Sequence, residues 1–157
     1  MLGSYFPVSQ SNFEDIRLAN GVYIDKTQWI SKLVIRKAKY FISRPCKFGK
    51  SLFLSTLAAF FLNKYHLFDD LYIQKCNLSL LIQGQNISWS STMAAFPVIL
   101  LDFSRDLVYH KGKDLLEKSL TDKLKQIGET YGVTVVGDSV KEAIRSLVQA
   151  LAGLKNN

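Results

Sequence analysis

The segment FISRPCKFGKSL, residues 41–52, ends in Gly49, Lys50 and Ser51. These three residues match the last positions of the phosphate-binding pattern G-x-x-x-x-G-K-[ST], but Arg44 replaces the first glycine of the pattern. The residue after Arg44 is a proline, which disfavours a helical conformation for the residue before it. We therefore expect the chain to enter this loop through a turn of a different shape.

The residues on either side of the loop predict the context that such a phosphate site requires. The short apolar segment 39–42 predicts a strand, and the apolar run 50–62 predicts a buried helix. In that arrangement, backbone N–H groups at the start of the helix converge on phosphate oxygens. We expect the amides of residues 48–52 to form this cradle, Lys50 to contact phosphate and the Ser51 hydroxyl to bind Mg²⁺.

The composition fits one domain, or part of one, of a folded protein in a reducing compartment. Of the 157 residues, 48% are hydrophobic and 21% are charged, which allows a packed core. No apolar run reaches the roughly 18 residues of a membrane span, and the first residues lack the pattern of a secretion signal. Cys46 and Cys76 are too few for a disulfide framework or a zinc cluster. We expect a cytoplasmic protein without a membrane segment.

The net charge of +7 arises from one part of the chain. Residues 26–65 contain nine lysines and arginines and no acidic residue, so all 13 acidic residues lie outside them. A local positive field attracts phosphate, whether on a nucleotide or on a nucleic acid. A solvated basic helix face is the alternative explanation. The charge thus allows nucleic acid as a partner of residues 26–65, beside a nucleotide.

The rest of the chain alternates short apolar segments with helical patterns. Strands or extended pieces are expected at residues 22–24, 39–42, 97–103 and 133–136. Helices are expected at residues 13–17, 29–34, 50–62, 116–131 and 140–151. Expected N-caps are Asn12, Asp25, and Asp138 or Ser139, while residues 86–92 read as a loop. This alternation predicts an α/β fold with a mainly parallel sheet flanked by helices.

Four motifs follow one another along residues 13–105. They are NFEDIRLANGVYIDKTQWISKL at 12–33, RPCKFGKSL at 44–52, LFDDLYI at 67–73 and FPVILLDFS at 96–104. In this order they resemble the AAA-ATPase-like family of P-loop proteins, whose signature RPRRFGKSL already has an arginine at the first glycine position. Family members commonly carry a C-terminal nuclease-like domain of the PD-(D/E)XK type, and its motif does not occur in this sequence.

The resemblance implies that a P-loop NTPase-like domain binds ATP with Mg²⁺. The residues that it assigns to the nucleotide are Arg44, Lys47, Phe48, Gly49, Lys50, Ser51, Leu52 and Tyr23, with Ser51 also on the metal. Tyr23 is included because, in related ATPases, the segment before the preceding helix often runs beside the adenine, so residues 23–27 are expected to lie near the loop and to help wall the base site. Two alternatives stay open: Phe48 as a core anchor, and Asp25 as a helix cap only. Cys46 stands where the family has an arginine, which removes one positive charge from the loop.

The resemblance also implies that the catalytic acids of the family are missing here. Its Walker B motif, an apolar strand ending in LIDEYD, follows a helix like residues 140–151, and the sequence ends at Asn157. Asp102 ends an apolar segment but is followed by Phe103, so we interpret it as the end of a neighbouring strand. We therefore expect an incomplete sheet, no catalytic residue and loss of hydrolysis.

Residues 1–157 are then expected to be the N-terminal fragment of an ATPase domain, with lead-in helices at 1–38 and a partial core at 39–157. Nucleotide binding is the first of three functions that stay open. The second is a nucleic-acid-binding module, supported by the basic segment and its interleaved aromatic residues. The third is an inactive gene remnant.

Overall fold

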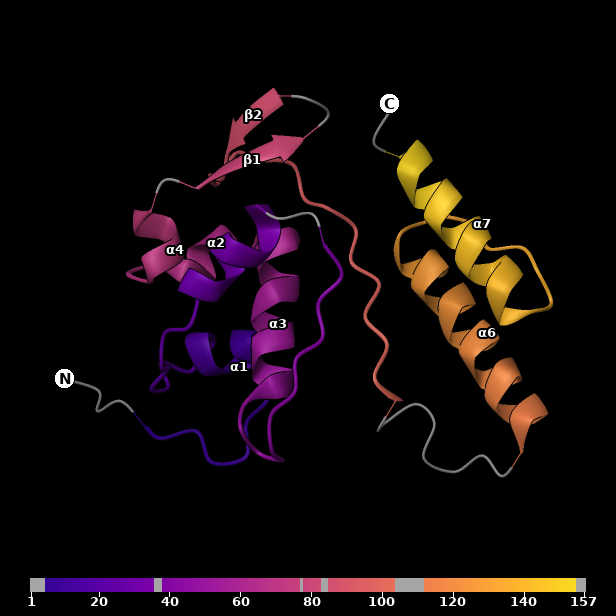
Figure 1. Ribbon diagram of the computed structural model, residues 1–157, viewed down its shortest axis with the longest axis horizontal. Coiled ribbons are helices and arrows are strands. Elements are labelled where there is room, and N and C mark those ends of the chain that lie inside the picture. Colours follow the sequence, from indigo (N-terminus) through magenta and orange to yellow (C-terminus); the bar gives the residue numbers. More distant parts are fainter. Residues whose placement is uncertain (1–4, 36–37, 77, 83–84, 104–111, 155–157) are drawn as a thin grey trace. The chain divides into compact units, whose positions relative to one another are not determined.

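The computed structural model describes residues 5–35, 38–76, 78–82, 85–103 and 112–154. It divides into two compact units, the N-terminal unit Met1–Val98 and the C-terminal unit Ile99–Asn157 (Figure 1). Each unit has its own cluster of buried apolar residues. The loop at residues 44–52 belongs to the N-terminal unit, so the elements of that unit position the candidate site.

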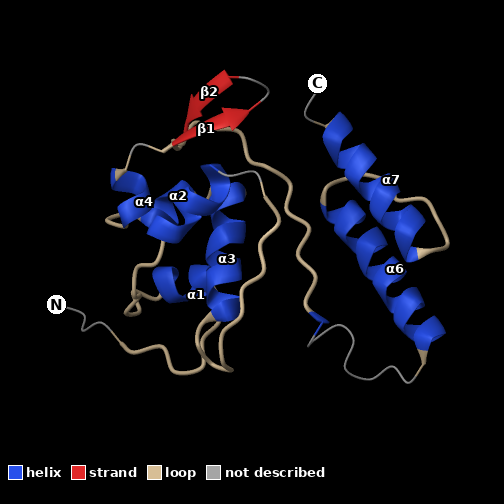
Figure 2. Ribbon diagram, viewed as in Figure 1, coloured by secondary structure: helices blue, strands red, loops and turns tan. Residues whose placement is uncertain are grey.

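The N-terminal unit is mainly helical and carries one small hairpin (Figure 2). Its helices are α1 (Phe13–Leu18), α2 (Gln28–Ile35), α3 (Lys50–Phe61), the 3₁₀ helix η1 (Tyr65–Phe68) and α4 (Tyr72–Lys75). Its strands β1 (Ser79–Ile82) and β2 (Gln85–Ser88) pair antiparallel, with Ser79 opposite Ser88. The structure confirms the three helices that we expected in this unit, as α1, α2 and α3.

Helix α1 begins where the sequence predicts. The Asn12 side chain accepts a hydrogen bond from the Glu14 amide at 3.0 Å and satisfies one of the donors left open at the start of the helix. The Phe13 amide donates to Ser55 Oγ at 2.9 Å, which holds α1 against α3. The N-terminal segment is thereby fixed beside the helix that follows the 44–52 loop.

The core of the N-terminal unit is built around aromatic rings. Phe13, Phe60 and Phe68 are fully buried, and Trp89 is 4% exposed. The ring centroids of Phe60 and Trp89 lie 4.8 Å apart, those of Phe68 and Trp89 5.2 Å, and those of Phe13 and Phe68 4.9 Å. Ring pairs at such distances contribute about 0.5–1.5 kcal/mol beyond the burial of their surface. The aromatic cluster thus joins α1, α3, η1 and the end of the hairpin.

One carboxylate and one hydroxyl tie the segment before α2 to α4. Asp25 Oδ1 accepts from the amide and the hydroxyl of Thr27 at 2.8 and 2.7 Å, and Oδ2 accepts from the Tyr72 amide at 2.7 Å. The buried Thr27 hydroxyl accepts in turn from the Ile73 amide at 3.1 Å. Desolvation opposes ionisation of Asp25, but the hydrogen bonds from Tyr72 and Thr27 outweigh it and lower its pKa. Asp25 therefore stabilises the turn that begins α2.

The expected mainly parallel sheet is wrong for the described residues. Their only strand ladder is the antiparallel β1–β2 hairpin, beside a single bridge between Tyr5 and Gly21, and β2 lies where we expected part of a loop. The segments expected as strands, 22–24, 39–42, 97–103 and 133–136, form none. A strand requires the backbone of a neighbouring strand, whereas an apolar pattern shows only that a segment favours burial. The described chain is therefore helical with one hairpin, and not a parallel α/β sheet.

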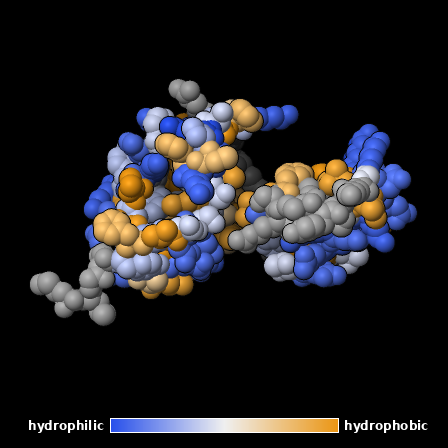
Figure 3. All heavy atoms as spheres, turned by 90° about the horizontal axis from the view of Figure 1, so that it is seen from below, coloured by the Kyte–Doolittle hydropathy of each residue, from blue (hydrophilic) through white to orange (hydrophobic). Residues whose placement is uncertain are grey.

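The extended segments leave large apolar side chains exposed within each unit. In the N-terminal unit Phe41 is 93% exposed, and in the C-terminal unit Leu100 is 50% exposed. On the face of the N-terminal unit seen in Figure 3, apolar residues interrupt the hydrophilic surface. These side chains were expected to be buried in the sheet, and their exposure follows from its absence among the described residues.

The C-terminal unit consists of α6 (Lys113–Thr130) and α7 (Val140–Gly153), which pack against each other. Buried Leu124 of α6 and Leu147 of α7 belong to one apolar cluster with Val135 of the connecting segment. Ser139 caps α7, because its side chain accepts from the Glu142 amide and the Glu142 carboxylate accepts from the Ser139 amide. Both expected helices are confirmed, and Ser139 rather than Asp138 is the cap.

Candidate functional site

The 44–52 loop turns through two residues with left-handed backbone. Lys47 has φ +64°, and Gly49, the N-cap of α3, has φ +76° and ψ +21°. A Cβ built on Gly49 would meet no heavy atom within 4 Å, so the space beside this residue is open. The Gly49 carbonyl accepts from the Phe53 amide at 2.9 Å, which starts the first turn of α3. The loop therefore directs the open N-terminus of a 12-residue helix toward solvent-accessible space.

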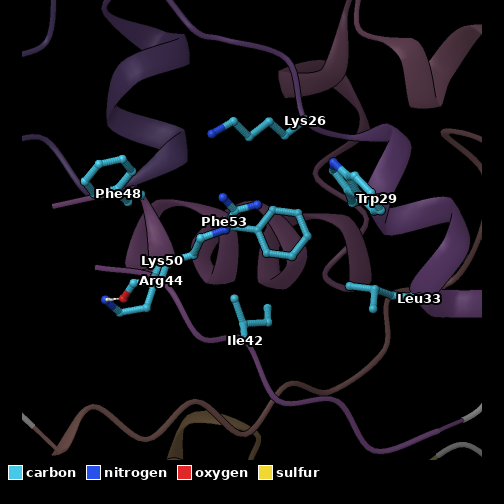
Figure 4. Close-up of a pocket in the computed structure, with 9 residues that line it drawn as sticks. Lys26, Trp29, Leu33, Ile42, Arg44, Phe48, Lys50 and Phe53 are labelled. Atoms are coloured by element: carbon cyan, nitrogen blue, oxygen red, sulfur yellow. Dashed lines mark hydrogen bonds between the residues drawn. The ribbon is translucent and has the colours of Figure 1, made fainter. Parts of the chain in front are cut away.

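The Lys50 side chain folds back over the loop. Its Nζ donates to the carbonyl oxygens of Arg44 and Pro45 at 2.8 and 3.0 Å, and Figure 4 shows the first of these bonds. Arg44, which replaces the first glycine of the motif, therefore contacts Lys50 through its backbone carbonyl. An ammonium group has three donors, so Lys50 can also bind an anion at this place.

A cavity of about 280 Å³ lies beside the loop, and we call it the Trp29 cavity. Three cationic residues line it, Lys26, Arg44 and Lys50, together with Gly49. Figure 4 shows how residues from α2, the 44–52 loop and α3 surround it. The apolar part of its wall consists of Trp29, Leu33, Ile42, Phe48 and Phe53. Positive charge and apolar surface therefore meet in one concave site.

A second cavity of about 390 Å³ adjoins the same loop, and we call it the Tyr23 cavity. It shares Lys26, Phe48, Gly49 and Phe53 with the Trp29 cavity. Its other lining residues are Phe6, Pro7, Gln10, Ile16, Val22, Tyr23, Ile24, Lys47 and Leu52. The segment that precedes α2 thus lies beside the loop, as the position assigned to Tyr23 requires.

The Tyr23 side chain is held by α3. Its hydroxyl lies 3.3 Å from Thr56 Oγ1, within hydrogen-bond distance, and Thr56 is fully buried. Burial of the phenol raises the Tyr23 pKa, and the hydrogen bond with Thr56 opposes this effect without cancelling it. Tyr23 is therefore a neutral wall of its cavity at physiological pH.

The interpretation of Phe48 as a core anchor is wrong, because its side chain is 64% exposed. Phe48 lies between the two left-handed residues of the loop and lines both cavities. The aromatic core of the unit instead consists of residues from α1, α3, η1 and the hairpin. The ring thus remains available for contact with a ligand.

The structure brings seven of the eight predicted site residues together around the two cavities. Arg44 and Lys50 line the Trp29 cavity, Tyr23, Lys47 and Leu52 line the Tyr23 cavity, and Phe48 and Gly49 line both. Ser51 is exposed in the first turn of α3 but belongs to neither lining.

Sequence reasoning included Lys26 only as part of residues 23–27, expected beside the base, and Trp29 only among the aromatic residues of the basic segment, although both line the Trp29 cavity. Lys26 belongs to the IDKT part of the first motif and to the acid-free segment, which was a usable signal. Trp29 gave a weaker signal, since an aromatic residue on the apolar face of a helix usually belongs to the core. It is instead 48% exposed, and Lys32 Nζ lies 4.4 Å from its ring centroid.

The described part of the chain contains no group of three or more His, Cys, Asp or Glu residues that could hold a metal ion. Mg²⁺ beside a phosphate usually takes hydroxyl, phosphate and water oxygens as its ligands. The exposed Ser51 hydroxyl fits that role. Lys64, which belongs to the same basic segment but lines neither cavity, forms a salt bridge with Glu14.

Comparison with known proteins places the chain in a family. A family model described as "Predicted AAA-ATPase" matches residues 7–156, so the chain belongs to this AAA-ATPase-like family. Over 68 residues it is 41% identical to an "Uncharacterized protein in vnfD 5'region" of Azotobacter chroococcum mcd 1. The match covers 43% of this chain and 13% of that protein. No solved structure matches the chain. Membership of the family agrees with nucleotide binding in a broad sense.

Among the described helices, none combines the length and the apolar character that a membrane crossing requires.

Proposed function

We propose that this chain binds ATP with Mg²⁺ at the 44–52 loop. One observation supports this proposal above the others: left-handed Gly49 opens the start of α3 at the point where Arg44 and Lys50 line a cavity. Backbone amides at a helix N-terminus and nearby cations are the two features that bind phosphate groups. Membership of the AAA-ATPase-like family supports the same conclusion.

Each loop residue has a distinct role in this proposal. The amides of residues 48–52 donate to phosphate oxygens, and Lys50 moves from the carbonyls of Arg44 and Pro45 to the β- and γ-phosphates. Arg44 and Lys47 add positive charge on the two sides of the loop. The Ser51 hydroxyl supplies one oxygen ligand to Mg²⁺, which would otherwise be held by phosphate and water.

We further propose that the chain binds ATP without hydrolysing it at an appreciable rate. Phosphoryl transfer requires a carboxylate that orients the metal and a residue that positions the attacking water. The residues that line the two cavities are cationic, apolar or neutral polar. Such residues can bind a nucleotide, but none of them supplies the carboxylate that the reaction requires. Release of phosphate from ATP by the purified chain, if abolished in Lys50→Ala, would contradict this part of the proposal.

Isothermal titration with ATP, with and without Mg²⁺, tests the binding. The Lys50→Ala variant should lose most of the affinity, because it removes the cation from the loop. Lys39→Ala is the matched control, since Lys39 is an exposed lysine of the same basic segment and lines neither cavity. Equal affinity of the wild type and Lys50→Ala, or no binding by the wild type, would refute the proposal.

Single-stranded nucleic acid is the second candidate ligand. Phe41 is 93% exposed and Tyr40 is 45% exposed, and Lys39 precedes them in the basic segment. Exposed aromatic rings among cations can stack on bases while the cations contact the backbone. Binding of an oligonucleotide that weakens steeply with salt and is lost in Phe41→Ala would favour this function over the first. Absence of both kinds of binding would favour an inactive remnant.

A further inference from the structure

We propose that Lys26 binds the phosphate groups of the nucleotide, as a cation that the segment before α2 contributes beside those of the 44–52 loop. This inference rests on the proposed function, because it adds a contact to the phosphates that bind at the loop. The sequence pattern gives Lys26 no such role, since the phosphate motif covers the loop alone. A polyphosphate would then be held by two segments that α2 separates in the sequence.

The Lys26 side chain lies where the two cavities adjoin the start of α3. Four of the described residues line both cavities, namely Lys26, Phe48, Gly49 and Phe53, and Lys26 is the charged one among them. Gly49 is the N-cap of α3, with open space beside its backbone. In the view of Figure 4 the ammonium end of Lys26 is directed toward the loop residues and away from Trp29. A phosphate bound by the open amides at the start of α3 would therefore share a cavity with this ammonium group.

The backbone on both sides of Lys26 is fixed, so its side chain starts from a defined position. The preceding residue, Asp25, accepts a hydrogen bond from the Tyr72 amide at 2.7 Å. The following residue, Thr27, is fully buried, and its hydroxyl accepts from the Ile73 amide at 3.1 Å. Association is weakened by the cost of ordering flexible groups, and a fixed backbone reduces that cost. These contacts thus prepare Lys26 for a ligand in the adjoining cavities.

The charge of Lys26 is not neutralised within the described part of the chain. The ion pairs among the described residues involve other lysines. The carboxylate next to it in the sequence, Asp25, accepts hydrogen bonds from Thr27 and Tyr72 through its two oxygens. A cation without a protein counter-ion in a concave site attracts anions. A polyphosphate can supply the negative charge that the protein does not.

The test compares ATP with inorganic tripolyphosphate, which has the phosphates without the base and ribose. Isothermal titration in the presence of Mg²⁺ gives the dissociation constant of each ligand for the full chain. Lys26→Met removes the charge and keeps a long apolar side chain. It should weaken the binding of both ligands by the same factor, about three- to fivefold, which is the size of one exposed charge pair. Lys26→Arg should keep most of the affinity, because it retains the charge.

Lys32→Met is the matched control for the loss of one positive charge. Lys32 belongs to the same basic segment, and its Nζ lies 4.4 Å from the Trp29 ring centroid, but it lines neither cavity. Because salt screens exposed charges that do not touch the ligand, this variant should change each dissociation constant by less than about twofold. Melting curves from circular dichroism check that each variant is folded.

The outcomes separate this inference from the proposed function. If the wild type binds both ligands in a Lys50-dependent manner and Lys26→Met binds them equally well, only the role of Lys26 is wrong. If Lys26→Met weakens the binding of ATP alone, Lys26 contacts the base or the ribose and the inference is overturned. If Lys26→Met and Lys32→Met weaken both ligands equally, Lys26 acts only through the general positive field, which also overturns it. If the wild type binds neither ligand, the proposed function and this inference fail together.

Discussion

Replacement of Gly49 by alanine should have two effects that can be measured separately. It should destabilise the N-terminal unit, and it should weaken ATP binding. Gly49 has φ +76°, and a Cβ added to it would meet no heavy atom within 4 Å. The folded protein therefore has room for the methyl group, and the strain is confined to the backbone. Left-handed conformation costs a non-glycine residue about 1–2 kcal/mol, so we expect the N-terminal unit to lose about this much stability.

Gly132 provides a matched control in the C-terminal unit. It has φ +67° and the same open space around a built Cβ, so Gly132→Ala should reduce the stability of its own unit by a similar amount. Gly49 lines both cavities, whereas Gly132 lines neither. The alanine methyl at position 49 would occupy the space that the proposed phosphate needs. Because hydrogen bonds to charged groups contribute about 1.5–3 kcal/mol, loss of one should weaken ATP binding roughly ten- to hundredfold.

Two measurements decide this prediction. Amide hydrogen exchange reports the local stability of each unit separately, and isothermal titration reports ATP affinity. Gly49→Asn is an informative third variant, because asparagine adopts left-handed backbone more readily than alanine. It should recover part of the stability but none of the affinity. Wild-type affinity in Gly49→Ala, or an equal loss of affinity in Gly132→Ala, would refute the reasoning.

Three further predictions concern stability. Because its pKa is lowered in the folded protein, the stabilisation by Asp25 is present above the ordinary carboxyl pKa of about 3.9 and is lost as the pH falls through the folded-state value. The free energy of unfolding in urea should therefore fall less between pH 5 and pH 3 in Asp25→Asn than in the wild type or in the control variant Asp15→Asn. Phe60→Ala should destabilise the N-terminal unit by about 3–5 kcal/mol, since Phe60 is fully buried, while Phe41→Ala should have little effect in the same thermal unfolding assay. Ser139→Ala should cost the C-terminal unit about 1 kcal/mol by hydrogen exchange and leave exchange in the N-terminal unit unchanged.

The helices and their caps could be predicted because their signals are local. Asn12 and Ser139 each act on residues within three positions, and the apolar spacing of α6 and α7 defines one face of each helix. The expected parallel sheet was wrong because strand pairing depends on which distant segments of the chain meet, and a local apolar pattern does not show this. The β1–β2 hairpin was missed for a different reason, because Gln85 to Ser88 is polar and resembles a loop.

The candidate site was predicted in part for similar reasons. The loop motif identified Gly49 and Lys50, which lie next to each other in sequence and need no tertiary information. The contact of Lys50 with the carbonyl of Arg44 depends on the path of the loop, and the contribution of Trp29 depends on how α2 and α3 line the same cavity. The exposure of Phe48 also contradicted an expectation from hydrophobicity alone. Its surroundings depend on left-handed Lys47, for which the sequence gave no signal.

Two of the four motifs that mark the family contact each other directly, which gives both of them a structural role. In the first motif, the Arg17 guanidinium donates at 2.8 Å to the carbonyls of Leu67 and Asp69, which belong to the LFDDLYI motif. From the same first motif, Asp25 accepts from the Tyr72 amide of LFDDLYI.

The loop motif joins this network through the helix that it begins. Ser55 of α3 accepts from the Phe13 amide, and Thr56 of α3 lies within hydrogen-bond distance of Tyr23. These side chains hold the segment before α2 beside the start of α3, where the two cavities form. Asp25 thus acts on the site by fixing the backbone next to Tyr23, without lining a cavity itself. Segments that are distant in the sequence thus form one connected set of contacts, and these contacts position the loop.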